Sequence, residues 1–72
     1  MTDISHLKTP NEILEVALEK ETQAHDFYEQ LRVHCSVDFV EEMLLKLQNE
    51  EAKHMRMIQR MLGRLESGRE IV

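Results

Sequence analysis

Two glutamates and a histidine are the residues of this 72-residue chain whose types and spacing suit chemistry. Glu51 and His54 form a Glu-x-x-His motif, and a spacing of three places both side chains on one face of a helix. Glu21 precedes Glu51 by thirty residues. Carboxylate oxygens and imidazole nitrogens are ligands for iron and zinc. Because a Glu-x-x-His motif is common on helix surfaces, the elements that carry these residues decide whether they form a metal site.

The first of these elements is a helix predicted over residues 10–34. Thr9 is a suitable N-cap, Pro10 occupies the first helical position, and Glu12 follows three residues after the cap. Residues 1–8 lack helical periodicity, so we expect them to form a flexible arm.

A second helix is predicted over residues 37–66, after a turn centred near Cys35. Ser36 is the expected N-cap of this helix. Ser67 and Gly68 form a helix stop signal, so residues 67–72 are expected to be a short tail. The prediction is an all-α chain, a single two-helix hairpin domain spanning residues 1–72.

Each helix carries a stripe of residues at alternating spacings of three and four, which is typical of a helix packed in a bundle. In the second helix seven members of the stripe are apolar and two, Glu51 and His54, are polar. The full stripe is Val37, Val40, Leu44, Leu47, Glu51, His54, Ile58, Met61 and Leu65. In the first helix it is Leu14, Leu18, Glu21, His25, Tyr28 and Arg32.

The polar members of the two stripes are predicted to lie at the same level of the hairpin. Glu21 is 14 residues before Cys35 and Glu51 is 16 residues after it. At 1.5 Å per residue these are roughly 21 and 24 Å along the helices. Two carboxylates buried together would repel each other, and each would be costly to bury without a partner. A bound metal cation is the simplest way to neutralise them, and a satisfied polar layer that sets the packing register is the alternative.

The small size of the chain indicates that the hairpin pairs with a second copy, because a domain of this length buries little apolar surface alone. Two copies supply four glutamates and two histidines, the ligand set of di-iron four-helix bundles. The net charge of −5 argues against nucleic acid or an anionic membrane as a partner. With Cys35 as the only cysteine there is no intrachain disulfide, and the N-terminus lacks the pattern of a signal peptide. We therefore expect a soluble, cytoplasmic homodimer.

Two segments of the chain resemble the encapsulated ferritins, two-helix relatives of rubrerythrin and ferritin. These segments are ETQAHDFY, from Glu21 to Tyr28, and EEAKH, from Glu50 to His54. The resemblance covers about residues 12–65. The sequence departs from the family at Phe27, where a tryptophan is frequent, and at Lys20 and Gln23, where further glutamates are frequent. Residues 68–72 also differ from the extension that docks such proteins in an encapsulin shell.

The resemblance implies a ferritin-like four-helix bundle made by dimerisation, with two irons per dimer. It implies that Glu21 is a terminal ligand, Glu51 a bridging carboxylate, His54 a nitrogen ligand and Tyr28 a hydroxyl beside the ligands. The implied activity is a ferroxidase that oxidises Fe(II) with oxygen for iron handling or storage. The implied partners are further copies in a ring-like homo-oligomer, either free-standing or enclosed in an encapsulin shell.

Three other functions remain open at this point. A non-catalytic helical dimerisation or adaptor module would use the same polar residues for hydrogen bonds between subunits. A rubrerythrin-like peroxidase would use the same iron site, although its usual rubredoxin electron donor has no counterpart in this chain. A structural zinc site would also suit these ligands. We expect His25 to bond to a neighbouring carboxylate at the edge of the interface, and Glu50 to face solvent.

Overall fold

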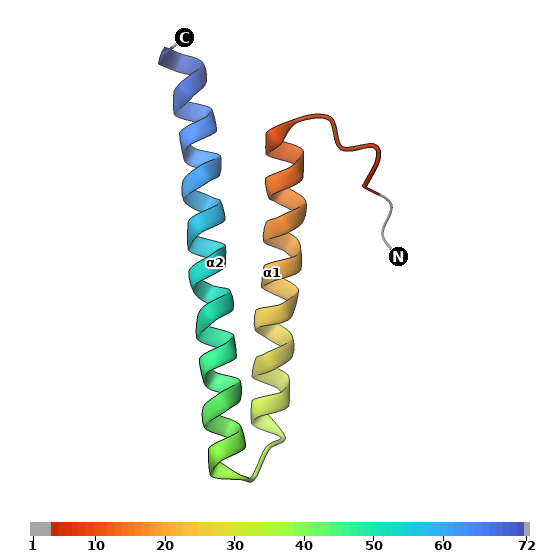
Figure 1. The fold of residues 1–72 in the computed structure, drawn as a ribbon, viewed down its shortest axis with the longest axis vertical. Helices are drawn as coiled ribbons and strands as arrows, with labels where there is room; N and C mark the ends of the chain where they lie inside the picture. Colours follow the sequence, from red (N-terminus) through yellow and green to blue (C-terminus); the bar gives the residue numbers. More distant parts are fainter. Residues whose placement is uncertain (1–3, 72) are drawn as a thin grey trace.

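The protein is a hairpin of two antiparallel helices, α1 (Pro10–Val33) and α2 (Asp38–Ile71), as Figure 1 shows. The computed structural model describes residues 4–71, with side chains described for residues 4–68. Within residues 4–71 there is no strand, so the predicted all-α hairpin is confirmed. α1 begins and α2 ends at the end of the hairpin opposite the turn, which we call the open end (Figure 1). No helix in the described range is long and apolar enough to cross a membrane.

The start of α1 follows the predicted capping pattern. Thr9 has an extended backbone, with φ −118° and ψ 153°, and its hydroxyl accepts a hydrogen bond of 3.1 Å from the backbone N–H of Glu12. Pro10 occupies the first helical position, where its missing N–H costs nothing. The predicted N-cap is therefore confirmed. Residues 4–8 are not helical and lead away from the hairpin (Figure 1).

The start of α2 lies one residue later than expected. Its first hydrogen bonds return to the carbonyl of Val37, which accepts from the backbone N–H groups of Val40 at 3.1 Å and Glu41 at 2.9 Å. The cap position is therefore Val37 rather than Ser36. The thiol of Cys35 donates to the same carbonyl at 3.5 Å, so this free cysteine helps to close the turn.

The predicted end of α2 at Glu66 is wrong, because the helix continues through Ser67 and Gly68 to Ile71. A glycine ends a helix by adopting the left-handed conformation. No described glycine has a positive φ, and apart from its chain neighbours and the backbone of its own helix no atom comes near the position that a side chain at Gly68 would occupy. The last turns of α2 extend past α1 (Figure 1), so no neighbouring element redirects the chain there.

The hairpin has no closed hydrophobic core of its own. Its principal extents are 53 × 28 × 12 Å, and the shortest equals about one helix diameter. Among residues 4–68 no hydrophobic residue is buried, and the only buried residue is Gln48, at 7% exposure. A layer one helix thick leaves both of its flat faces uncovered, as expected for half of a four-helix bundle.

The apolar stripe of α2 divides into two rows rather than facing α1 as a whole. Leu44, Glu51 and Ile58 are half-buried, as expected for side chains turned toward α1. Leu47 and Met61 are exposed, at 37% and 43%. Alternate members of a stripe spaced by three and four lie on different sides of its centre line, so along the middle of the hairpin only one row is covered. Near the turn this division is lost, because Val37 is exposed and Val40 is half-buried. This partial coverage agrees with the expectation that a hairpin of this length buries little apolar surface alone.

Candidate metal centre

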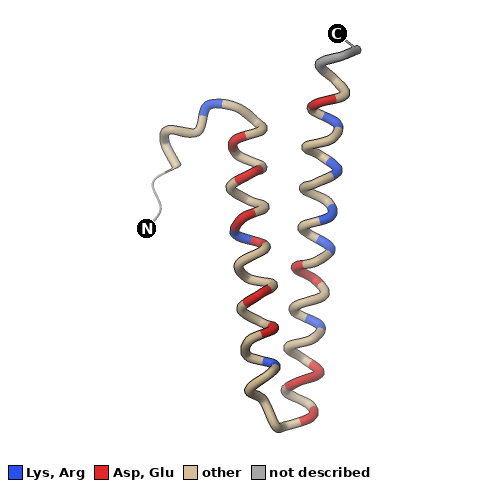
Figure 2. Tube along the Cα trace, turned by 180° about the vertical axis from the view of Figure 1, so that it is seen from behind, with Lys and Arg blue, Asp and Glu red and all other residues tan. Residues whose placement is uncertain are grey.

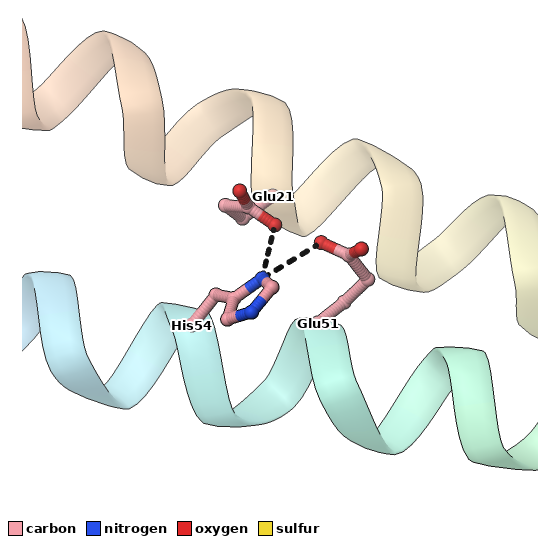
Figure 3. A group of neighbouring side chains, drawn as sticks. All are labelled: Glu21, Glu51 and His54. Atoms are coloured by element: carbon pink, nitrogen blue, oxygen red, sulfur yellow. Dashed lines mark hydrogen bonds and ion pairs between the residues drawn. The ribbon is translucent and has the colours of Figure 1, made fainter.

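Glu21 from α1 and Glu51 and His54 from α2 meet in one layer near the middle of the hairpin (Figure 3). The Nδ1 atom of His54 lies 3.3 Å from Oε2 of Glu21 and 3.7 Å from Oε2 of Glu51. One potential ligand atom from each residue lies within 4.8 Å of the other two. The three residues thus lie at one level, as the sequence predicts. In Figure 3 both dashed contacts end on the same imidazole nitrogen, so Nδ1 is the atom of His54 that faces the two carboxylates.

The three side chains differ in exposure, and the difference gives the cluster an open side. Glu51 is the most covered at 18%, Glu21 is 30% exposed, and His54 is 44% exposed. His54 is spaced by seven residues from Leu47 and from Met61, two exposed members of the stripe. Residues seven apart lie on nearly the same face of a helix. The histidine therefore stands in an exposed apolar row.

The donor set fits a metal ion that prefers oxygen and nitrogen ligands. Two donors bound to one ion by bonds of about 2.1 Å lie roughly 3.0–3.4 Å apart in octahedral or tetrahedral geometry. The 3.3 Å between His54 and Glu21 falls in that range, and the 3.7 Å to Glu51 needs a small movement. Among residues 4–68, the only ion-pair partner of either carboxylate is His54 itself. The cluster therefore has more negative charge than its own residues balance, as a cation site requires.

Among residues 4–68, Tyr28 forms no hydrogen bond with Glu21, Glu51 or His54. It is half-buried on α1, and its described contact is with the ring of Phe27, at a centroid distance of 6.1 Å. Its role as a hydroxyl beside the ligands therefore stays a prediction.

The sequence analysis missed a polar network centred on Gln48. The side-chain carbonyl of Gln48 accepts from Nε of Arg32 at 3.3 Å, and its amide nitrogen lies 3.3 Å from Nε2 of His25. On the other side of the imidazole, Nδ1 of His25 lies 3.1 Å from Oδ1 of Asp26. The expected bond between His25 and a neighbouring carboxylate is confirmed. The spacing of Gln48 could have predicted its burial. It stands four residues after Leu44 and three before Glu51, so it lies on the same face of the helix as both.

This network also explains why His25 is a poor metal ligand. Asp26 and Glu29 approach His25 closely enough to suggest a second cluster, but both are exposed. Since the carbonyl of Gln48 accepts from Arg32, its amide N–H₂ points at Nε2 of His25. Nε2 then accepts, and Nδ1–H donates to Asp26. Neither nitrogen has a free lone pair for an ion.

A helical hairpin that places a glutamate of one helix and a Glu-x-x-His motif of the other in one layer has the features of the ferritin-like di-iron carboxylate class. The sequence profile of the rubrerythrin family matches residues 12–72. The chain therefore belongs to the rubrerythrin family, whose members typically bind iron. Searches of the curated proteins and of the solved structures gave no match.

Proposed function

We propose that the protein is a ferroxidase that oxidises Fe(II) with oxygen at a site shared by two copies of the chain. The observation that carries this proposal is the convergence of Glu21, Glu51 and Nδ1 of His54 without a balancing cation. One copy offers three ligating groups, too few for two iron ions. Two copies offer four carboxylates and two imidazoles, the complete set of the di-iron bundles.

The exposure of the proposed ligands supports a site that is shared by two copies of the chain. His54 is the most exposed ligand and stands in the exposed apolar row with Leu47 and Met61. Met43, Met57 and Ile13 add to the uncovered apolar surface of the hairpin. A second copy laid against the His54 side would bury this surface and bring its own ligands to the same layer.

Each ligand then has a distinct task. Glu51 is the most covered, so it lies deepest in the bundle, where a carboxylate can bridge two ions. Glu21 and His54 would each hold one ion. The carboxylates favour Fe(III) over Fe(II), because hard anionic oxygens stabilise the higher charge more strongly.

The reaction uses Fe(II) and oxygen as substrates. Two Fe(II) ions each lose one electron and become Fe(III), and O₂ takes up both electrons and two protons to give hydrogen peroxide. Two ions side by side supply both electrons together, which is why a paired site suits the reaction. The resemblance to the encapsulated ferritins supports iron handling as the purpose, with a ring-like assembly and an encapsulin shell as its setting.

A second candidate is a non-catalytic dimerisation module, and one observation favours it. The hydrogen bond between His54 and Glu21 already gives both groups a partner without metal. Such a layer could serve only to set the register between two copies.

Iron stoichiometry and the initial rate of Fe(II) oxidation in air separate the two candidates. We expect Glu51→Ala to abolish paired iron binding and to reduce the rate at least about 100-fold, because each dimer loses both bridging carboxylates. His54→Ala should weaken binding less, since four carboxylates remain, and should slow oxidation. Glu42→Ala, an exposed glutamate on the same helix, is the matched control. A Glu51→Ala protein that oxidises iron like the wild type, or an equally damaging Glu42→Ala, would reduce the cluster to a packing layer.

A further inference from the structure

The outer faces of the two helices carry opposite charges in the half of the hairpin near its open end. Figure 2 shows acidic residues following one another along this half of α1 and basic residues along this half of α2. Glu15 and Glu19 on α1 are exposed, as are Arg56 and Arg60 on α2. We call the first pair the acidic edge and the second pair the basic edge.

Helical geometry places both edges on the outside of the hairpin. Glu19 stands two residues before Glu21, and Arg56 stands two residues after His54. Two residues correspond to about 200° of rotation, so both side chains point away from the metal cluster. Glu15 and Arg60 are each four residues further along and share those outer faces.

The two edges also match in height. The contact of 3.3 Å between Glu21 and His54 shows that these residues are level. Glu19 and Arg56 are each displaced from that level by two residues toward the open end, and Glu15 and Arg60 by six. At 1.5 Å per residue the displacements are roughly 3 and 9 Å on both helices. A copy placed beside the hairpin in the same orientation would therefore bring Glu15 opposite Arg60 and Glu19 opposite Arg56.

Neither edge is balanced within its own chain. Among residues 4–68 none of the four side chains forms an ion pair, and Glu19 only accepts a hydrogen bond of 3.4 Å from Gln23. Like charges spaced by four residues destabilise a helix. The helix dipole does not account for Arg56 and Arg60, because it acts within the last turn and α2 continues to Ile71. Both edges would gain from a partner of opposite charge.

We propose that the partner is another copy of this chain, whose acidic edge docks along the basic edge to join copies side by side. The matched heights and opposite signs make the chain complementary to itself. The contact is heterologous, so repetition gives a ring if the rotation closes and a filament if it does not. It is separate from the apolar face, and it neither requires the proposed ferroxidase activity nor uses its ligands.

Charge reversal of one edge, and then of both, tests this contact. Arg56→Glu/Arg60→Glu places acidic edges against each other, and Glu15→Arg/Glu19→Arg places basic edges against each other. We expect either variant to raise the protein concentration needed for species larger than a dimer at least about tenfold. The variant with all four changes restores opposite charges and should recover the larger species. In the wild type they should disappear in about 1 M NaCl, where the Debye length is near 3 Å, while dimers persist.

Masses are measured by sedimentation and by native mass spectrometry, on iron-loaded and on chelated protein, so that the result is independent of activity. Lys8→Glu/Lys46→Glu changes the net charge as much as the basic-edge reversal but lies at exposed positions outside both edges, and it should assemble normally. Circular dichroism checks that each variant is helical. The proposal is overturned if one-edge reversals assemble like the wild type, or if the helical four-change variant fails to recover. A wild type that stays dimeric at low salt would also overturn it and would point to another acidic or basic protein as the partner.

Discussion

At the scale of single residues, the most buried side chain among residues 4–68 is polar. Gln48 uses both ends of its side-chain amide, accepting from Arg32 and facing Nε2 of His25 across the two helices. It stands one turn before Glu51, and His25 stands one turn after Glu21. A buried amide with both ends satisfied specifies one register between the helices. The network therefore helps to bring the metal ligands to the same level.

Replacing Gln48 tests whether its hydrogen bonds stabilise the pairing of the two helices. Gln48→Met keeps the length of the side chain but leaves Arg32 and His25 without their partner. We expect a loss of about 1–2 kcal/mol in the free energy of unfolding, below the cost of a fully buried orphan because both partners are partly exposed. Urea denaturation at fixed protein concentration measures it. The same change at the exposed Gln30 is the control, and equal effects at both positions would contradict the role given to Gln48.

At the scale of elements, the two helices depend on different signals. The start of α1 is set locally, by the Thr9 hydroxyl on the N–H of Glu12 and by Pro10 in the first turn. At the end of α2 the predicted stop signal at Gly68 does not end the helix, since Gly68 stays helical and no other described element packs against it. A glycine such as Gly68 ends a helix only where the surrounding structure turns the chain. Beyond the start of α1 no element of the described chain lies beside α2 to do so, and the helix continues.

The contribution of the cap can be measured with two threonines that play opposite roles. Thr9→Ala removes the acceptor for the Glu12 N–H and should cost about 1 kcal/mol of stability. Thr22 lies inside α1, where its hydroxyl donates to the carbonyl of Leu18 at 2.8 Å. Thr22→Ala should be close to neutral, because alanine has the higher helix propensity. Thermal unfolding of both variants gives the comparison, and a larger loss at Thr22 would show that the cap does not stabilise α1.

At the scale of the whole molecule, the hairpin is a layer one helix thick that lacks a core of its own. We therefore expect its stability to depend on association with a second copy, and the ligands of the proposed site would come from two copies. In the proposed dimer, metal binding and dimerisation would be linked, because the free energy of one would contribute to the other.

Metal should therefore tighten the dimer, and acid should loosen it. Protons compete with the metal for the imidazole of His54 and for the carboxylates, so lowering the pH releases metal and weakens association. We expect the dimer dissociation constant, measured by sedimentation equilibrium, to be at least about tenfold lower with Fe(II) under anaerobic conditions than with chelator. His54→Ala should reduce that difference. Equal dissociation constants with and without metal would remove the link between the site and the dimer.

The helices, the turn near Cys35 and the level of Glu21, Glu51 and His54 followed from the sequence alone. They depend on local capping and on residue spacing, because a regular helix rises by a constant distance per residue and the height of a side chain follows from counting. Only the tertiary structure showed that Leu47, His54 and Met61 form an open row, that Gln48 is buried between His25 and Arg32, and that α2 continues through Gly68. Those features depend on which side of each helix meets the other, and on where a partner element is missing. A stripe of apolar residues does not encode either of these, because the same pattern suits one neighbouring helix or two.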